Sequence, residues 1–306
     1  MSHCANTFGV HCYSAHKRKM QLTNLLISIL VSFATLQQIK CMMKEECDEP
    51  KPILLDLAED SLRDQYKDCT AEMSKKVYNN YLKSELNTEP FKSTWNEATK
   101  LCKNKGLFGS DNLEKEHVIA IYAYTMGGVK GQKKLNRVFN YQTKTGGRDY
   151  ETFPFKSLHF FLTEAVRILK GKDEEKCRTV FRGTICEFEV QENTPVRFGQ
   201  FTSTSLNKDI AKTFGTGTLF EIETCDGAYI NKYSHFIGQN QEEVLIPPYE
   251  TFKVVSKEGN VIQLKHMDYA NDQNCLALKN IPSTSNASAR KINTNKAANG
   301  GTKKSG

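Results

Sequence analysis

The strongest constraint on the fold of this chain is a change of hydrophobic periodicity near Cys177. From Ile53 to about Lys172, apolar residues recur at the spacing of amphipathic helices. Beyond Cys177 they alternate with polar residues in short runs, which is typical of strands. Because the helices precede the strands instead of alternating with them, the pattern predicts an α+β fold, with an N-terminal mainly helical part followed by a β-rich half.

Three helices are predicted in the first part of the chain. One surrounds Trp95, another follows Asp111-x-x-Glu114, whose spacing indicates a capping box, and a third covers 155–169. Their apolar faces are expected to form the core. His159, on the third helix, is expected to be an interior histidine with satisfied hydrogen bonds and not a ligand.

The second half is predicted to consist of strands separated by turns. Gly259 supplies a tight turn between the last two, and Pro247-Pro248 ends the strand that begins at Glu243. We expect the polar ends of several strands to gather over one cleft. The predicted strands are 178–184, 186–190, 197–202, 218–224, 228–233, 243–246, 251–257 and 260–265.

The N-terminal region, 1–40, has the pattern of a secretory signal peptide. A basic cluster ends at Lys19, an apolar stretch covers 22–36, and Ser32-Phe33-Ala34 offers a small-x-small cleavage step. The apolar stretch is shorter than the roughly 20 residues of a membrane span, so no stable membrane insertion is expected once the signal is removed, although an uncleaved anchor is an alternative. We therefore expect a secreted, extracellular protein.

The remaining composition limits the other function classes. The net charge of +7 is concentrated at the two ends, and the middle has no basic stripe with interleaved aromatic residues, so no nucleic-acid binding is expected. Residues 50–280 are expected to form one domain, and the polar tail 281–306 is expected to be disordered. Within that tail, Asn286 begins a sequon and is a candidate glycosylation site.

The cysteines indicate an oxidising compartment. The chain has 10, and signal removal would take Cys4 and Cys12 and leave an even number, as disulfide pairing requires. No Cys-x-x-Cys pair is present and the histidines do not cluster with the cysteines, so no metal site is predicted.

Polar residues interrupt the apolar pattern of the β-rich half at three places: Arg182-Gly183, Ser203 and Glu243. An arginine inside a strand needs an anionic partner, and its guanidinium suits a phosphate or a carboxylate. A glycine lets a flat ligand approach the backbone closely, and a serine can orient a catalytic carboxylate. Each residue also has a structural explanation, a salt bridge for Arg182 and a surface hydroxyl for Ser203, so only their combination indicates a site.

That combination resembles the Arg-Ser-Glu class of mono-ADP-ribosyltransferases, specifically the vertebrate extracellular family, which is related to NAD-cleaving toxins. The matching motifs are V-F-R-G-T around Arg182, F-T-S-T-S around Ser203 and E-V-L-I-P-P from Glu243. The resemblance covers roughly 55–275. It implies a cleft between two packed β-sheets that holds NAD as the substrate, with no metal.

The resemblance also implies a role for each site residue. Arg182 would meet a phosphate of NAD, Gly183 would bond the carboxamide, and Phe214 would stack on the nicotinamide. Ser203 would position Glu243, whose carboxylate would stabilise the positive charge that develops on the ribose as the glycosidic bond breaks. The catalytic residues would thus be Arg182, Ser203 and Glu243.

Two disulfides carry over from the family, and a third is a guess outside its pattern. The family pairs correspond to Cys69 with Cys275 and Cys177 with Cys225. The guess joins Cys102 to Cys186.

One position departs from the family's pattern. Arginine-specific members carry Glu-x-Glu, whereas this chain has Gln241 before Glu243, and an amide can bond a guanidinium but cannot act as its base. Gln241, Tyr233 and Phe236 are expected to recognise the acceptor protein. The alternatives are an NAD glycohydrolase with little transferase activity, a catalytically silent secreted binding protein, or a disulfide-stabilised domain with no NAD site.

Overall fold

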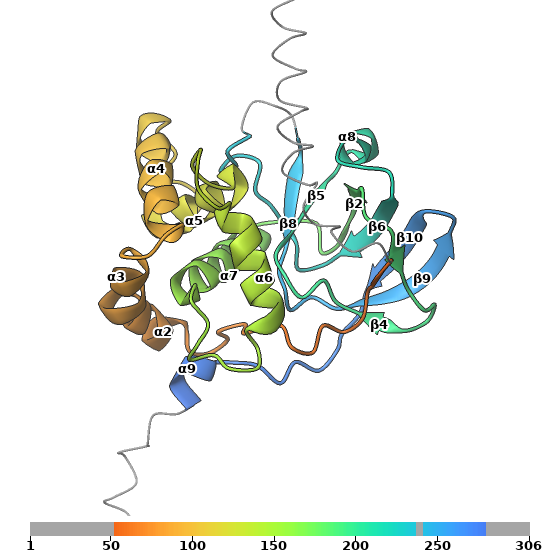
Figure 1. Ribbon diagram of the computed structural model, residues 1–306, viewed down its shortest axis with the longest axis horizontal. Coiled ribbons are helices and arrows are strands. Elements are labelled where there is room, and N and C mark those ends of the chain that lie inside the picture. The colour runs from red at the N-terminus through yellow and green to blue at the C-terminus, as the bar shows by residue number, and fades with distance from the viewer. Residues whose placement is uncertain (1–51, 237–240, 280–306) are drawn as a thin grey trace, which may run out of the picture.

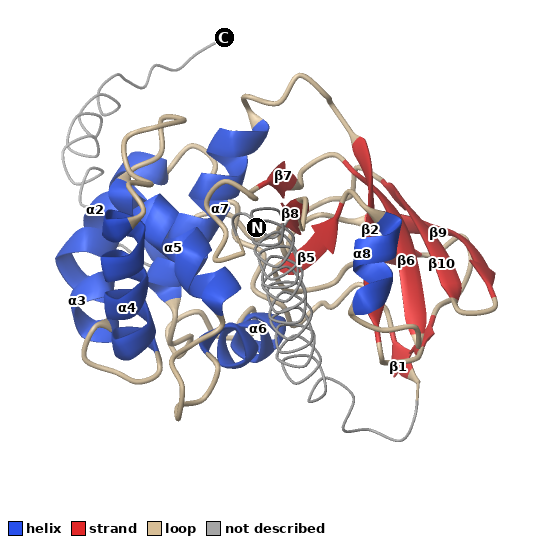
Figure 2. Cartoon of the chain, turned by 90° about the horizontal axis from the view of Figure 1, so that it is seen from above, coloured by secondary structure: helices blue, strands red, loops and turns tan. Residues whose placement is uncertain are grey.

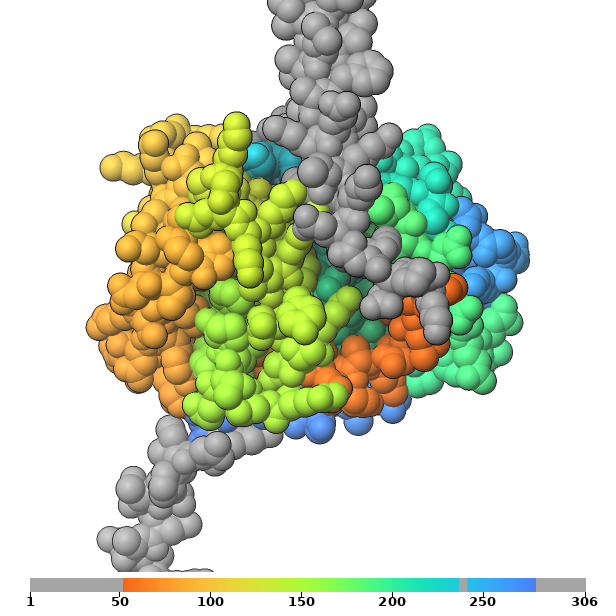
Figure 3. All heavy atoms as spheres, viewed as in Figure 1, coloured from red at the N-terminus to blue at the C-terminus, as the bar shows by residue number. Residues whose placement is uncertain are grey.

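The computed structural model describes residues 52–236 and 241–279, which form a helical part beside a sheet (Figures 1 and 2). The predicted signal segment, the polar tail and Asn286 lie outside the described residues. The segment that follows residue 52 (orange in Figures 1 and 3) passes from the strands to the helices along one side of the molecule. The predicted α+β class is confirmed.

Helix α5 lies at the centre of the helical part. Every residue from His117 to Thr125 is buried, which is the pattern of a helix surrounded by other elements. Helices α4, α6 and α7 all contact it. The helices are α2 (Thr70–Lys76), the π-helical turn η1 (Val77–Tyr81), α3 (Leu82–Glu85), α4 (Phe91–Asn104), α5 (Lys115–Met126), α6 (Leu135–Thr145), α7 (Lys156–Lys170), α8 (Lys208–Thr213) and α9 (Leu276–Lys279).

The three predicted helices are confirmed as α4, α5 and α7, but the predicted cap of α5 is wrong. The N-cap is Glu114, whose side chain accepts from the backbone of His117, while the backbone N–H of Glu114 donates to His117 Nδ1 at 3.1 Å. Asp111 instead has a positive φ of 59° and forms an ion pair with Lys232. The turn at Asp111 therefore precedes the helix and does not cap it.

The prediction for His159 is confirmed. The side chain is buried, its Nδ1 accepts from the Tyr66 hydroxyl at 2.8 Å, and its Nε2 donates to the Leu62 carbonyl at 3.2 Å. Burial lowers the pKa of His159 to about 3, so the ring is neutral and both nitrogens are satisfied.

The strands form one large sheet and one small one. Eight strands pair in the order β4-β9-β10-β6-β2-β5-β8-β7, and β1 pairs with β3. Phe181 and Ser205 form the one residue pair that joins β2 to β5, so the large sheet divides there, and its β5-β8-β7 part lies next to the helices (Figure 2). The strands are β1 (Ile53–Leu54), β2 (Arg178–Thr184), β3 (Phe188–Glu189), β4 (Pro195–Val196), β5 (Thr202–Ser205), β6 (Thr218–Thr224), β7 (Ala228–Tyr229), β8 (Glu243–Ile246), β9 (Phe252–Glu258) and β10 (Val261–His266).

Strand β8 is buried on both faces. Val244 and Ile246 pack in the core between the strands, whereas Leu245 packs in the core of the helical part. Because side chains alternate along a strand, β8 separates these two cores, and Glu243 at its start shares the face of Leu245. The apolar run that follows Glu243 therefore fixes the direction in which this carboxylate points.

Two predicted strands are wrong. The region 197–202 is not a strand up to Phe201, because the buried Arg197 bonds the N-terminal segment: its N–H donates to the Asp56 carbonyl and its Nη1 to the Leu57 carbonyl, both at 2.7 Å. The predicted strand 228–233 ends at Tyr229, because the N–H groups of Tyr233 and Ser234 both donate to the Ile230 carbonyl and form a turn.

The two family disulfides, Cys69–Cys275 and Cys177–Cys225, are present. The guess that joins Cys102 to Cys186 is wrong, since Cys102 is free and Cys186 is bonded elsewhere. Cys102 lies on the buried face of α4 within the helical core, and burial raises its pKa to about 12. It is an interior apolar residue and not half of a disulfide.

Candidate active site

A cavity of about 760 Å³ lies between the helical part and the strands. Its strand wall contains Arg182, Ser203 and Glu243, and its helical wall contains Tyr124 from α5 and Asn140 from α6. The three residues predicted to be catalytic, which are far apart in the sequence, therefore line one cavity. Its volume lies in the usual range for small-molecule sites.

The pairing of β5 with β8 brings Ser203 and Glu243 together. These strands are antiparallel, with Ser203 opposite Leu245 and Ser205 opposite Glu243. Directly paired residues share a face of the sheet, so Ser203 and Glu243 are diagonal neighbours on the face that borders the cavity. The register of a single strand pair thus decides the contact.

Arg182 lies in the neighbouring strand β2, where it is paired with Phe220 of β6. Its Nη1 donates to the Ser203 carbonyl at 3.0 Å, so the guanidinium crosses the junction between β2 and β5. A guanidinium carries five N–H donors in a planar fork that matches phosphate oxygens. Its place on the cavity wall suits an anionic part of a ligand.

Glu243 is buried and is held by two hydroxyl groups. Ser234 donates to its Oε2 at 2.7 Å, and Ser203 also hydrogen-bonds the carboxylate. Burial raises the pKa of Glu243, and the hydrogen bonds from Ser234 and Ser203 lower it. The two serines therefore favour the ionised form of a carboxylate that burial alone would favour as neutral.

Gly183 and Phe214, the two other residues predicted to bind NAD, both line the cavity. A Cβ on Gly183 would lie 2.2 Å from the Ala211 carbonyl oxygen and 2.6 Å from that of Gly215, so glycine is needed here for α8 to pack against β2. Phe214 is the C-cap residue of α8. The end of the short helix therefore places Phe214 on the cavity wall, and Gly183 is the point where the helix approaches β2 closely.

The three residues predicted to recognise an acceptor do not all lie on the cavity wall. Gln241 and Phe236 line the cavity with Glu243, whereas Tyr233 is outside the lining. Tyr233 is buried, and its hydroxyl contacts Asp111 and Ser110. It joins the segment after β7 to the turn before α5.

Several residues of the cavity had no place in the sequence-based prediction. Tyr124 donates its hydroxyl to the Phe201 carbonyl at 2.7 Å, and Asn140 donates to the same oxygen at 3.3 Å. Helix α6, which was not predicted, also places Arg137 and Lys144 around the cavity, and Lys133 lines the cavity from the segment just before this helix. The sequence signal that indicates this helix is the helical spacing of apolar residues in 135–145, between two glycine pairs.

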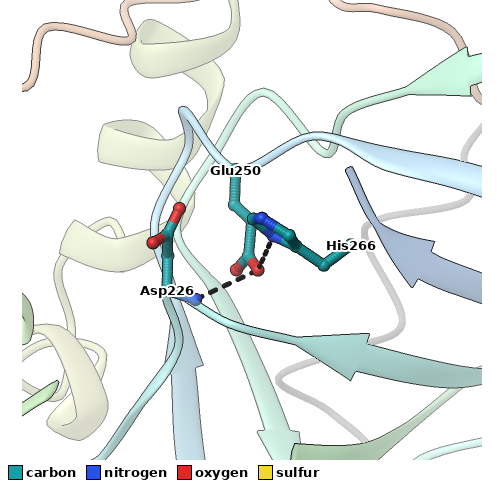
Figure 4. A group of neighbouring side chains, drawn as sticks. All are labelled: Asp226, Glu250 and His266. Carbon is teal, nitrogen blue, oxygen red and sulfur yellow. Dashed lines mark hydrogen bonds and ion pairs between the residues drawn. The ribbon is translucent and has the colours of Figure 1, made fainter. Parts of the chain in front are cut away.

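A second group of titratable side chains lies away from this cavity, at the end of β6 (Figure 4). Asp226, Glu250 and His266 converge there. Both oxygens of Glu250 are engaged: Oε2 accepts from the Thr224 hydroxyl at 2.6 Å, and Oε1 accepts from the N–H of Cys225 at 2.7 Å and from His266 Nδ1 at 2.9 Å. The group therefore anchors the turn that carries Cys225, and the carboxylate of Glu250 faces donors of the protein itself.

Residues 55–272 match the sequence profile of the NAD:arginine ADP-ribosyltransferase family. Among individual proteins, the erythroblast NAD(P)(+)--arginine ADP-ribosyltransferase of Gallus gallus is 38% identical over 240 residues, which are 75% of this chain and 77% of the relative. Ecto-ADP-ribosyltransferase 5 of Bos taurus is 37% identical over 219 residues, which are 67% of each chain.

Solved structures agree with this similarity. The crystal structure of the eukaryotic mono-ADP-ribosyltransferase ART2.2 superposes with a TM-score of 0.64 at 33% identity, covering 74% of this chain and 99% of that one. A mutant of the same protein in complex with NAD gives a TM-score of 0.64 at 34% identity over the same shares. With a matched profile over most of the domain and relatives above 30% identity, the chain belongs to the NAD:arginine ADP-ribosyltransferase family.

Proposed function

We propose that this protein is an NAD-dependent mono-ADP-ribosyltransferase, which cleaves the bond between nicotinamide and ribose and transfers ADP-ribose to a protein side chain. The observation that carries the proposal is the buried carboxylate of Glu243, held by two serine hydroxyls in the same cavity as Arg182. The similarity to a NAD-bound relative supports the same substrate.

The cavity suits the parts of NAD. The pyrophosphate carries two negative charges, and Arg182 from β2 together with Lys133, Arg137 and Lys144 around α6 gives the lining a positive excess over Glu243. Phe214 provides a ring for the nicotinamide beside Gly183. Glu243, at the start of β8, is then available to the nicotinamide ribose.

Bond cleavage needs a fixed negative charge. As nicotinamide leaves with the bonding electron pair, positive charge develops on the ribose, and an ionised carboxylate hydrogen-bonded to a ribose hydroxyl stabilises it. Ser203 and Ser234 hold Glu243 in position before the reaction, so no reorganisation of the carboxylate is required. Attack on the ribose carbon by an acceptor atom, with loss of its proton, completes the transfer, and attack by water completes a hydrolysis.

The acceptor depends on the residue at position 241. Gln241 lines the cavity two residues before Glu243, where an amide can hydrogen-bond a guanidinium but cannot take its proton. Glu242 lies outside the lining and does not replace the missing carboxylate. We therefore propose that hydrolysis of NAD is prominent and that Gln241 limits transfer to arginine.

We propose that the protein acts outside the cell. Several relatives carry names such as ecto-ADP-ribosyltransferase, and this chain contains two long-range disulfides, which persist in oxidising compartments. Among the described ranges 52–236 and 241–279, no helix has both the length and the apolar character to cross a membrane.

The test is nicotinamide release from NAD by the full chain, compared with Glu243→Gln and, as a matched control, Glu242→Gln. We expect release by the wild type and the control, and a loss of roughly hundredfold or more in Glu243→Gln, because the charge that stabilises the transition state is removed while the shape is kept. Release that is equal in wild type and Glu243→Gln would refute the proposal.

A further inference from the structure

The carboxylate of Glu243 has a hydrogen-bond donor that lies outside the three family motifs. Ser234 is fully buried, five residues after the end of β7, and its Oγ lies 2.7 Å from Glu243 Oε2. Ser203, the motif serine, is only half-buried on the cavity wall. The more enclosed of the two hydroxyls is thus the one that the motifs do not contain.

The direction of the Ser234 hydroxyl is fixed by its other contact. The backbone N–H of Phe236 donates to Ser234 Oγ at 3.2 Å. A hydroxyl that accepts on one side directs its own proton elsewhere, and here the acceptor within reach is Glu243 Oε2. Ser234 therefore donates to the carboxylate.

The backbone around Ser234 is held on several sides. The N–H of Ser234 donates to the Ile230 carbonyl at 3.1 Å, while the N–H of Ile230 donates to the carbonyl of Glu243 itself at 2.9 Å. The next residue, His235, donates its N–H to Thr125 Oγ1 of α5 at 2.9 Å. A donor on such a fixed backbone is preorganised and loses little entropy when it holds its acceptor.

From this geometry we infer that Ser234 is a positioning residue for catalysis, which holds one oxygen of Glu243 so that the remaining lone pairs of the carboxylate face the substrate ribose. The inference rests on the proposed NAD-cleaving function. An ionised carboxylate has about four acceptor sites, so two serine donors leave room for a ribose hydroxyl. Phe236, which lines the cavity, is joined to this carboxylate through the same serine oxygen.

Loss of the donor should change both rate and pH dependence. Burial raises the pKa of Glu243 and the Ser234 hydrogen bond lowers it, so Ser234→Ala should raise the pKa further. The acid limb of kcat/KM should then move to higher pH, because Glu243 must be ionised to act. The other charged and titratable groups of the surrounding elements are Arg182, Tyr124, His235, Lys133, Arg137 and Lys144. All of them are the same in the wild type and in Ser234→Ala.

The experiment measures nicotinamide release against pH for the full-length wild type, Ser234→Ala, Ser234→Cys and the control Thr99→Ala, which removes a hydroxyl bonded within α4. For Ser234→Ala we expect kcat to fall roughly tenfold to hundredfold, as for a lost hydrogen bond to a charged group, with little change in KM for NAD. Cysteine has a similar volume and is a weaker donor, so the kcat of Ser234→Cys should fall between those of the wild type and Ser234→Ala. The kcat of Thr99→Ala should match that of the wild type.

A kcat and an acid limb that both stay at wild-type values in Ser234→Ala would overturn the inference, as would a rise in KM alone. If the alanine protein does not fold, the acid limb of Ser234→Cys decides in the same way. The carboxyl pKa of Glu243, measured by ¹³C NMR and assigned with Glu243→Gln, tests this inference separately from the proposed function. If Ser234→Ala or Ser234→Cys leaves this pKa unchanged, the inference about Ser234 is overturned, even in a protein that releases no nicotinamide. If the wild type releases no nicotinamide, the proposed function is overturned.

Discussion

At the scale of the residue, we propose that the choice of acceptor depends on Gln241. It lines the cavity, as Phe236 does, and its backbone carbonyl accepts from the Ser205 hydroxyl at 2.7 Å, so its backbone is held against β5. A change at this position therefore alters chemistry with little change in shape. Charge is the variable that distinguishes an amide from a carboxylate here.

Gln241→Glu should raise the ratio of arginine-directed transfer to hydrolysis by roughly tenfold or more, because a carboxylate pairs with the guanidinium and can accept its proton. The measurement uses labelled NAD with agmatine as acceptor and quantifies ADP-ribosyl-agmatine against free ADP-ribose. Glu242→Gln, a change of charge outside the lining, should leave the ratio where it is. An unchanged ratio in Gln241→Glu would contradict the role given to this position.

At the scale of elements, helix α7 begins without a capping side chain of its own. Its first turn is instead satisfied by Glu85 at the end of α3, whose Oε1 and Oε2 accept from the Ser157 N–H at 3.0 and 3.2 Å. A carboxylate at a helix N-terminus is favourable, but Glu85 is buried, and burial raises its pKa to about 7. The contact joins α3 to α7, and its contribution to stability depends on pH.

The pKa of Glu85 is higher in the folded state than in an unfolded chain, so between the two pKa values the folded state binds more protons than the unfolded state. The stability of the fold therefore decreases as the pH rises from the unfolded pKa toward the folded pKa of about 7. Glu85→Gln keeps an acceptor without a charge. We expect its unfolding free energy, measured by chemical denaturation, to gain on the order of 2 kcal/mol relative to the wild type between pH 5 and pH 8. Parallel pH profiles for the two proteins would show that Glu85 does not contribute.

At the scale of the whole molecule, the two disulfides whose cysteines both lie among the described residues close loops of very different length. Cys69–Cys275 joins the start of α2 to the start of α9 across a separation of 206 residues, whereas Cys177–Cys225 spans 48. The first therefore ties the ends of the described fold together, and the second joins the start of β2 to the turn held by Glu250.

Cross-linking restricts the unfolded chain more when the loop is longer, so replacing Cys69 and Cys275 by serine should cost about 5 kcal/mol and replacing Cys177 and Cys225 about 4 kcal/mol, as upper values from chain entropy. Thermal unfolding of the two double variants under one set of conditions makes the comparison. Cys102→Ala, which removes a free thiol, controls for the loss of a cysteine. A smaller loss for the Cys69 pair would show that native contacts outweigh loop length.

The local pattern of the sequence is sufficient for much of the fold. Helices α4, α5 and α7 follow from apolar spacing, β2 and β6 from alternation, and β8 from the apolar run before Pro247. The motif residues follow from their local context, because each depends on neighbours along the chain. The errors occur where a distant contact overrides local preference. Arg197 is not in the predicted strand, because it hydrogen-bonds the N-terminal segment. Cys102 is buried in α4 and forms no disulfide.

By itself, the sequence determined the α+β class and the family, and it predicted Arg182, Ser203 and Glu243 as the site. Only the tertiary structure decided what surrounds them: that Ser234 holds Glu243, that Tyr233 turns away toward Asp111, and that α6 adds cations to the cavity. The physical reason is that strand register and helix packing set these contacts, and both depend on burial summed over residues far apart in the chain.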